Sequence, residues 1–66
     1  MTDKLPKAEF TSVRRLQDGA HLITHMINDQ YLYTQRFMGY PMREAMRLAK
    51  ESATREAKES YQFINL

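Results

Sequence analysis

The sequence predicts an all-α fold, a two-helix antiparallel hairpin, on the strength of two observations. Apolar residues recur at alternating spacings of three and four along most of the chain, which is typical of amphipathic helices. The segment Met38-Gly39-Tyr40-Pro41 separates two such stretches. Gly39 can adopt the left-handed conformation that closes a helix, and Pro41 fits the first turn of the next one. The 66 residues are therefore expected to form a single helical-hairpin domain, 1–66.

Residues 1–6 are predicted to be a flexible arm, followed by a long first helix over about residues 7–38. Asp18-Gly19 is the weak point of this helix, because the dipeptide favours a turn and an interior glycine costs about 1 kcal/mol relative to alanine. The apolar phase passes through Gly19 without interruption. We therefore predict one continuous helix, and a break at Asp18-Gly19 is the alternative.

Residues 39–41 form the predicted turn, and the second helix should run over about residues 41–60. Small side chains along its inner stripe would allow a partner helix to approach closely. The last residues, 61–66, form a tail that is too apolar to be idle, so it either continues the helix or folds over the open end of the hairpin. The inner stripe of the second helix consists of Met42, Ala45, Met46, Ala49, Ala53 and Ala57.

The two predicted helices differ in length, at about 42 Å and about 30 Å. The shorter helix cannot cover the start of the longer one, and an apolar surface left uncovered usually marks an interface. Because twofold dimers are the commonest oligomers, we predict a homodimer that forms a four-helix bundle. The residues assigned to its core or dimer interface are Phe10, Val13, Leu16, Ala20, Ile23, Ile27, Phe37, Met42, Met46, Ala49 and Ala53.

The composition narrows the classes of function. Ten basic and eight acidic residues give a net charge of +2, a smaller excess than a dedicated nucleic-acid binder usually carries. The absence of cysteine excludes disulfides. The apolar runs are far shorter than the roughly 18 residues that span a bilayer, and the start of the chain lacks the plan of a signal peptide. We therefore predict a cytoplasmic protein.

Chemical motifs are sparse. His21 and His25 lie one helical turn apart and could bind a metal through both imidazoles, but two ligands do not complete a zinc site. We predict solvent-facing histidines and no metal or cofactor. The sequence also lacks a nucleophile arrangement, a phosphate-binding glycine loop and a pair of carboxylates in apolar surroundings. We therefore predict that the protein is not an enzyme.

Basic and aromatic side chains gather around the predicted bend and form the candidate partner-binding site. Such groups can bind an acidic protein surface or a nucleic-acid backbone. We predict a small regulatory or adaptor protein, of a bacterial or phage-borne kind, that binds a partner protein through leftover apolar helix surface. The alternative is an RNA- or DNA-binding hairpin dimer that uses the basic bend. The site residues are Arg36, Tyr40, Arg43, Arg47 and Lys50, and Arg14-Arg15 with Lys4 and Lys7 forms a second basic region at the opposite end of the hairpin.

One short segment resembles a known family. Met38-Gly39-Tyr40-Pro41, followed by Glu44-Ala45, resembles the loop and second helix of ubiquitin-associated domains, in which a Met-Gly-Phe/Tyr loop helps to contact ubiquitin. The pattern of that family's third helix is missing, and a long upstream helix does not fit a compact three-helix domain. The resemblance therefore assigns no family.

Overall fold

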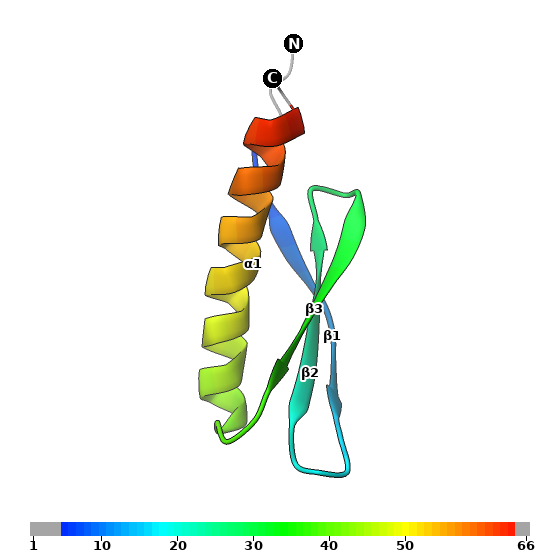
Figure 1. The fold of residues 1–66 in the computed structure, drawn as a ribbon, viewed down its shortest axis with the longest axis vertical. Helices are drawn as coiled ribbons and strands as arrows, with labels where there is room; N and C mark the ends of the chain where they lie inside the picture. Colours follow the sequence, from blue (N-terminus) through cyan, green and yellow to red (C-terminus); the bar gives the residue numbers. More distant parts are fainter. Residues whose placement is uncertain (1–4, 65–66) are drawn as a thin grey trace.

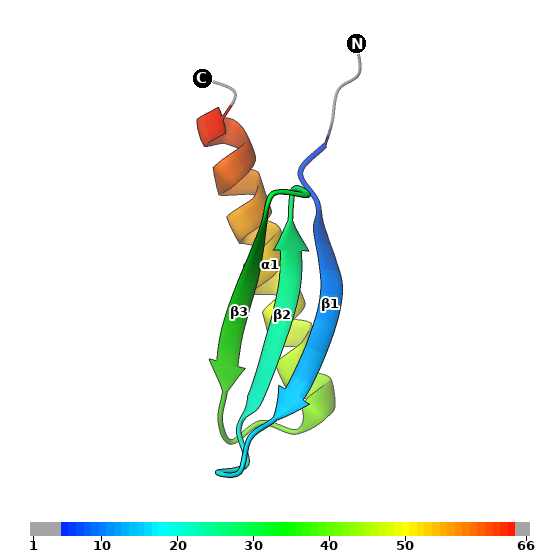
Figure 2. The same cartoon turned by 90° about the vertical axis from the view of Figure 1, so that its right-hand side faces the viewer.

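The computed structural model describes residues 5–64, which form three strands and one helix (Figure 1). In chain order these are β1 (Ala8–Arg15), β2 (His21–Ile27), β3 (Tyr31–Phe37) and α1 (Met42–Ile64). The strands form one antiparallel sheet in the order β1-β2-β3. The helix packs on one face of this sheet, and the opposite face, which we call the open face, is turned away from it (Figure 2).

The predicted all-α hairpin and four-helix bundle are therefore wrong, and the region assigned to one helix over about 7–38 is the sheet. The physical reason is an ambiguous spacing. Ile23 and Ile27 are four residues apart, which keeps them on one side of a helix but also on one side of a strand, where side chains alternate. The same region is rich in Ile, Thr and Tyr, which favour strands. The spacing therefore fits a helix and a strand equally well, and the strand-forming composition favours the strand.

Two tight turns fold the strands back on one another. Asp18-Gly19 lies in the β1–β2 turn, where Gly19 has a φ of 91° and the Ala20 N–H donates to the Asp18 carboxylate over 3.0 Å. In the β2–β3 turn, Asn28 and Asp29 have φ values of 50° and 59°. Hairpin turns require such positive values, and Asn and Asp tolerate them better than most residues. Both turns use backbone conformations that a continuous helix excludes.

β2 is the central strand and pairs with a neighbour on each side. On the β1 side, Phe10 lies opposite His25 and Val13 lies opposite Ile23, and a bulge interrupts the register between Phe10 and Ser12. Such a bulge inserts one extra residue and shifts the alternation of side chains. Phe10 and Val13 therefore face the same side of the sheet although they are three positions apart.

The core lies between β2 and α1. Ile23 and Ile27 are the largest fully buried side chains, and each packs against two alanines of the helix. Because alanine is small, the helix backbone can approach the sheet closely enough for the two isoleucines to fill the space between them. The four alanines are Ala45 and Ala49, which contact Ile23, and Ala53 and Ala57, which contact Ile27.

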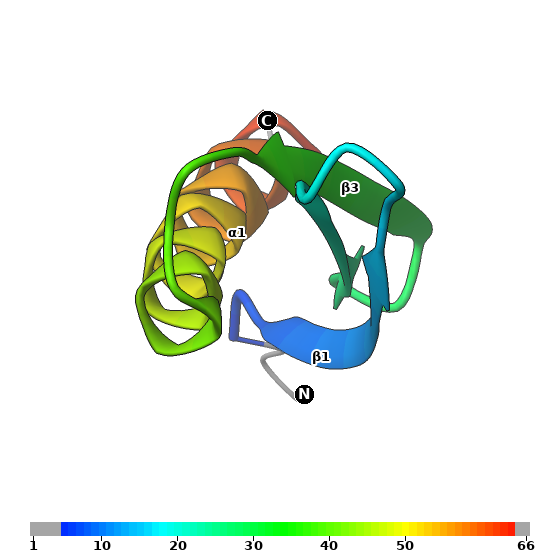
Figure 3. The same cartoon turned by 90° about the horizontal axis from the view of Figure 1, so that it is seen from below.

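The helix crosses the sheet diagonally. Near its beginning it packs beside Phe37 at the end of β3, and in its second half it packs beside Ala8 at the start of β1 (Figures 1 and 3). The end of β1 therefore lies away from the helix. Such a crossing is usual where a straight helix packs on a sheet whose strands twist.

α1 extends beyond the second helix that the sequence predicts. It begins at Met42 and continues through residues 61–64, which the sequence analysis assigned to the apolar tail. The rest of that tail, residues 65–66, and residues 1–4 of the predicted arm lie outside the described residues. Within the part of the chain that the structure describes, no helix is long and apolar enough to cross a membrane.

Candidate functional site

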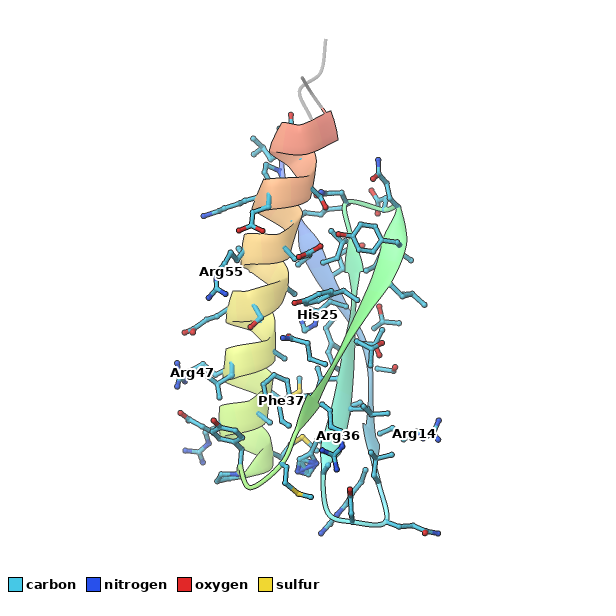
Figure 4. The ribbon with its side chains drawn as sticks, viewed as in Figure 1. Arg14, His25, Arg36, Phe37, Arg47 and Arg55 are labelled. Atoms are coloured by element: carbon cyan, nitrogen blue, oxygen red, sulfur yellow. The ribbon has the colours of Figure 1, made fainter. Side chains whose placement is uncertain are left out.

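The five residues of the predicted partner-binding site are all exposed, but they belong to three elements. Arg36 lies near the end of β3 opposite Leu22, on the open face of the sheet. Tyr40 lies in the loop between β3 and α1, and the others lie on the first half of the helix, where Figure 4 labels Arg47. Because β3 ends where α1 begins, all of them are in the same half of the molecule. Those on the helix are Arg43, Arg47 and Lys50.

The fold brings the second basic region to this same end, which corrects the prediction that it lies at the opposite one. Arg15 is opposite His21, and His21 is opposite Phe37, so the end of β1 and the end of β3 lie at one edge of the sheet. Only Lys7 lies at the other end, because it precedes β1; Lys4 is outside the described residues. We call this end, with its five arginines, the basic end: Arg14, Arg15, Arg36, Arg43 and Arg47.

The opposite end of the molecule carries more acidic than basic groups. The start of β1, the β2–β3 turn and the second half of α1 meet there (Figure 1). Lys7 forms ion pairs with Asp29, at 3.2 Å, and with Glu9, at 3.8 Å. The molecule therefore has a charge polarity along its long axis. We call this end the acidic end; its four carboxylates are Glu9, Asp29, Glu56 and Glu59, and its three basic side chains are Lys7, Arg55 and Lys58.

One arginine of the basic end is paired with a turn residue. Arg36 donates a hydrogen bond to the Asp18 carboxylate. The backbone N–H of Ala20, and then the Arg36 guanidinium, hold the pKa of Asp18 below its ordinary value. Both side chains are about half exposed, so the pair orients Arg36 on the sheet more than it stabilises the fold.

A second arginine is paired along the helix. Arg47 donates to Glu44 and, over 2.9 Å, to Glu51, one turn away on either side. The guanidinium of Arg47 lowers the pKa of Glu44, and Glu44 in turn raises the pKa of Arg47. Among the residues that the structure describes, the arginines of the basic end with no carboxylate within ion-pair distance are Arg14, Arg15 and Arg43.

Three large apolar side chains stand in solvent beside these arginines. Met38, Tyr40 and Met42 expose between 40% and 49% of their surface. The Tyr40 ring meets the Phe37 ring edge to face, with centroids 6.1 Å apart, which anchors the loop to the end of β3. Because the apolar patch and the nearest arginines are continuous in the chain, we treat them as one site. This loop site consists of Arg36, Met38, Tyr40, Met42 and Arg43.

The sequence predicted a core position for Met42, and the structure exposes both Met42 and Met38. Met38 follows β3 directly and lies in the loop before α1. Met42 is the first residue of α1 and precedes the turn on which the core begins at Ala45. A sign available in the sequence was the Gly39–Pro41 break itself, because residues around a chain reversal usually lie at the surface.

The residues predicted for a helical core or dimer interface divide by their position in the sheet and helix. Residues of β2 and the inner face of α1, together with Ala20, are buried: Ala20, Ile23, Ile27, Ala49 and Ala53. Leu16, Phe37 and Met46 are half-buried. Phe10, Val13 and Met42 are exposed, because β1 is an edge strand and Met42 lies at the start of the helix.

The two histidines are buried beneath the helix, which corrects the prediction that they face solvent. His21 and His25 expose 8% and 4% of their surface, since both are on the helix side of β2. His25 meets the Phe10 ring edge to face at 5.9 Å, and burial, followed by the charge of Lys50, lowers its pKa. Among the described residues, no group of three or more His, Cys, Asp or Glu side chains could hold a metal ion.

The chain matches no known protein family, no curated protein and no solved structure. The function proposed for it therefore rests on the arrangement of its own residues.

Proposed function

We propose that this chain is a small regulatory or adaptor protein without enzymatic activity. It acts in the cytoplasm by binding an acidic surface of a partner protein through the loop site. The observation that carries the proposal is the exposure of Met38, Tyr40 and Met42 at an end of the molecule that is rich in arginine. Tyr, Met and Arg are enriched in protein interfaces. The apolar side chains would supply affinity, and the arginines would set orientation and encounter rate.

The pattern of charges favours a protein over a nucleic acid. Carboxylates stand among the arginines of the basic end, and Asp18 and Glu44 engage two of them. This pairing leaves fewer free cations for a phosphate backbone, whose affinity depends on their number, whereas apolar contact with a protein does not depend on them. Exposed methionines contribute nothing to a phosphate contact but pack well against a protein surface. The RNA- or DNA-binding alternative is therefore an outcome of the test, not the proposal.

Site-specific photo-crosslinking tests this proposal. A benzophenone-bearing amino acid replaces Tyr40 in one variant and the exposed Lys58, at the acidic end, in a control variant. We expect irradiation in the source cells to give a protein adduct at position 40 that survives nuclease and is absent at position 58. A nucleic-acid adduct at position 40, or no adduct there, would contradict the proposal.

A competition experiment then tests the arginines. Purified unlabelled protein should suppress the adduct at position 40, and Arg43→Glu with Arg47→Glu should require at least about tenfold more protein to do so. The matched control, Arg55→Glu with Lys58→Glu, makes the same change of charge on exposed positions further along the helix. Equal competition by both double variants would remove the basic end from the site. Circular dichroism of each variant checks that the fold is unchanged.

A further inference from the structure

β1 is an edge strand whose side chains lie in solvent. Within the described residues it pairs with β2 alone, and all its residues after Ala8 are exposed. Phe10 and Val13 face the helix side of the sheet, yet they remain 50% and 39% exposed because β1 lies at the edge and the helix packs mainly over β2. An edge of this kind presents unpaired backbone N–H and C=O groups that can add another strand.

Because of the bulge, the side chains of β1 alternate between the two sides of the sheet in the same order from either end of the strand. From the pairing with β2, Ala8, Phe10, Val13 and Arg15 face the helix side of the sheet. Side chains that lie opposite each other in an antiparallel pair face the same side. In a regular strand Phe10 and Val13 would face opposite sides of the sheet, so Phe10 could not lie opposite the Val13 of a second, antiparallel copy of the strand. The extra residue at the bulge removes that obstacle.

The open side of β1 follows the same symmetry. Glu9 lies opposite Met26 and Arg14 lies opposite Leu22, so both point to the open face. If Phe10 of one copy lies opposite Val13 of another, then Glu9 lies opposite Arg14 of that copy. Apolar groups therefore meet on one side of the strand pair, and opposite charges meet on the other.

We propose that β1 of one copy pairs antiparallel with β1 of a second copy, with Phe10 opposite Val13 and Glu9 opposite Arg14. The twofold axis passes between Thr11 and Ser12, so each contact occurs twice. Two three-stranded sheets then join into one continuous sheet, and both helices lie on the same side of it. This dimer replaces the four-helix bundle, which the fold excludes.

The shape and charge of the whole molecule fit this arrangement. The helix lies beside the start of β1 and away from its end (Figure 3). Antiparallel pairing sets the start of one β1 against the end of the other, so each helix approaches where the other is distant. The same pairing brings the basic end of one copy to the acidic end of the other. The strand-to-strand contacts themselves do not include the loop site.

A charge-swap series tests the register. Glu9→Arg and Arg14→Glu each place like charges opposite each other twice per dimer, and both positions are exposed. We expect each single variant to raise the dimer Kd about tenfold and the double variant to restore it. Sedimentation equilibrium of the purified full chain at several concentrations gives these constants.

Disulfide trapping tests the same register without relying on charge, because the chain contains no cysteine. Under mild oxidation, a mixture of Glu9→Cys and Arg14→Cys proteins should form a crosslinked heterodimer rapidly. A mixture of Glu9→Cys with Thr34→Cys, on β3, is the control and should not. A chain that stays monomeric at millimolar concentration would overturn the proposal. So would a dimer that crosslinks equally in both mixtures or ignores the charge swap.

Discussion

β1 and β2 are neighbours in one sheet and face the same helix, yet only β2 is part of the core. Alternate residues of β2 are buried along its whole length, whereas β1 has no buried residue. The central strand has a neighbour on each side and the helix above it, and the edge strand has only one neighbour. Position in the sheet, more than side-chain type, therefore separates the surface that stabilises the fold from the surface that is available for binding.

Aspartate substitutions at Ile23 on β2 and at Val13, its partner on β1, should show the largest difference in stability between the two strands. Ile23 is 1% exposed, so Ile23→Asp buries an unpaired carboxylate and removes core packing, at a cost of more than about 4 kcal/mol. We expect the chain to unfold. Val13, directly opposite, is exposed, so Val13→Asp should change the free energy of unfolding by less than about 1 kcal/mol.

Circular dichroism during urea unfolding measures both effects. In a helical hairpin with both residues in its core, both substitutions would instead unfold the chain. Retained structure in Ile23→Asp would mean that β2 is not the centre of the core. Val13→Asp should also weaken the proposed dimer, since it sets a charge opposite Phe10 of the second copy.

An enlarged helix residue should give the next largest effect. Ala53 is fully buried between α1 and Ile27, so Ala53→Leu forces the helix away from the sheet and should cost about 1–3 kcal/mol. Lys58→Leu, on the exposed side of the same helix, should change the free energy of unfolding by less than about 0.5 kcal/mol. Equal costs for the two variants would show that the alanines do not set the distance between helix and sheet.

The two residues of the β2–β3 turn provide a finer comparison. Asn28 accepts a hydrogen bond from the Lys7 N–H and donates one to the Ala57 carbonyl, both at 2.9 Å, so it joins the residue before β1, the turn and α1. Glycine keeps the positive φ of both turn residues and removes only their side chains. Asn28→Gly should therefore cost about 1–3 kcal/mol, and Asp29→Gly, which removes an exposed ion pair, well under about 1 kcal/mol. Thermal unfolding would contradict this if both variants lost the same stability.

The sequence is more informative about α1 than about the sheet, for a physical reason. In α1, alanines at every fourth position stand among Glu, Lys and Arg, which are strong helix formers, so pattern and propensity agree. In β2 the spacing of Ile23 and Ile27 fits both periods, and only the strand-forming neighbours and the flanking turn signals distinguish them. Asp18-Gly19 is such a signal, since Asp-Gly between apolar segments is characteristic of hairpins. Weighing that signal above the apolar phase would have predicted the sheet.

The candidate site was less predictable than the fold. The five residues assigned to the bend are exposed near one end of the molecule, but the sequence did not indicate that Arg14 and Arg15 join them. That juxtaposition depends on strand register, which pairs residues far apart in the chain. The exposure of Phe10 and Val13 has the same origin, because a local pattern does not show which strand is at an edge.

The smallest expected effect concerns the pH dependence of the central strand. His25 faces Phe10 on β1, Tyr33 on β3 and Lys50 on α1. Burial and the Lys50 charge lower its pKa in the folded protein, whereas the unfolded chain binds a proton near pH 6.5. The unfolded state therefore takes up more protons as the pH falls below about 7, and stability should decrease from there toward the folded-state pKa.

Urea unfolding at a series of pH values measures this slope, and His25→Leu should reduce it. The paired carboxylates Asp18 and Glu44 act in a different range, because their pKa values are lowered in the fold and their contribution is lost only in more acidic solution, near and below pH 4. Lys50→Met should also flatten the slope, since it removes the charge that disfavours the imidazolium. An unchanged slope in both variants would show that protonation beneath the helix does not couple to folding, leaving β2 a purely apolar support.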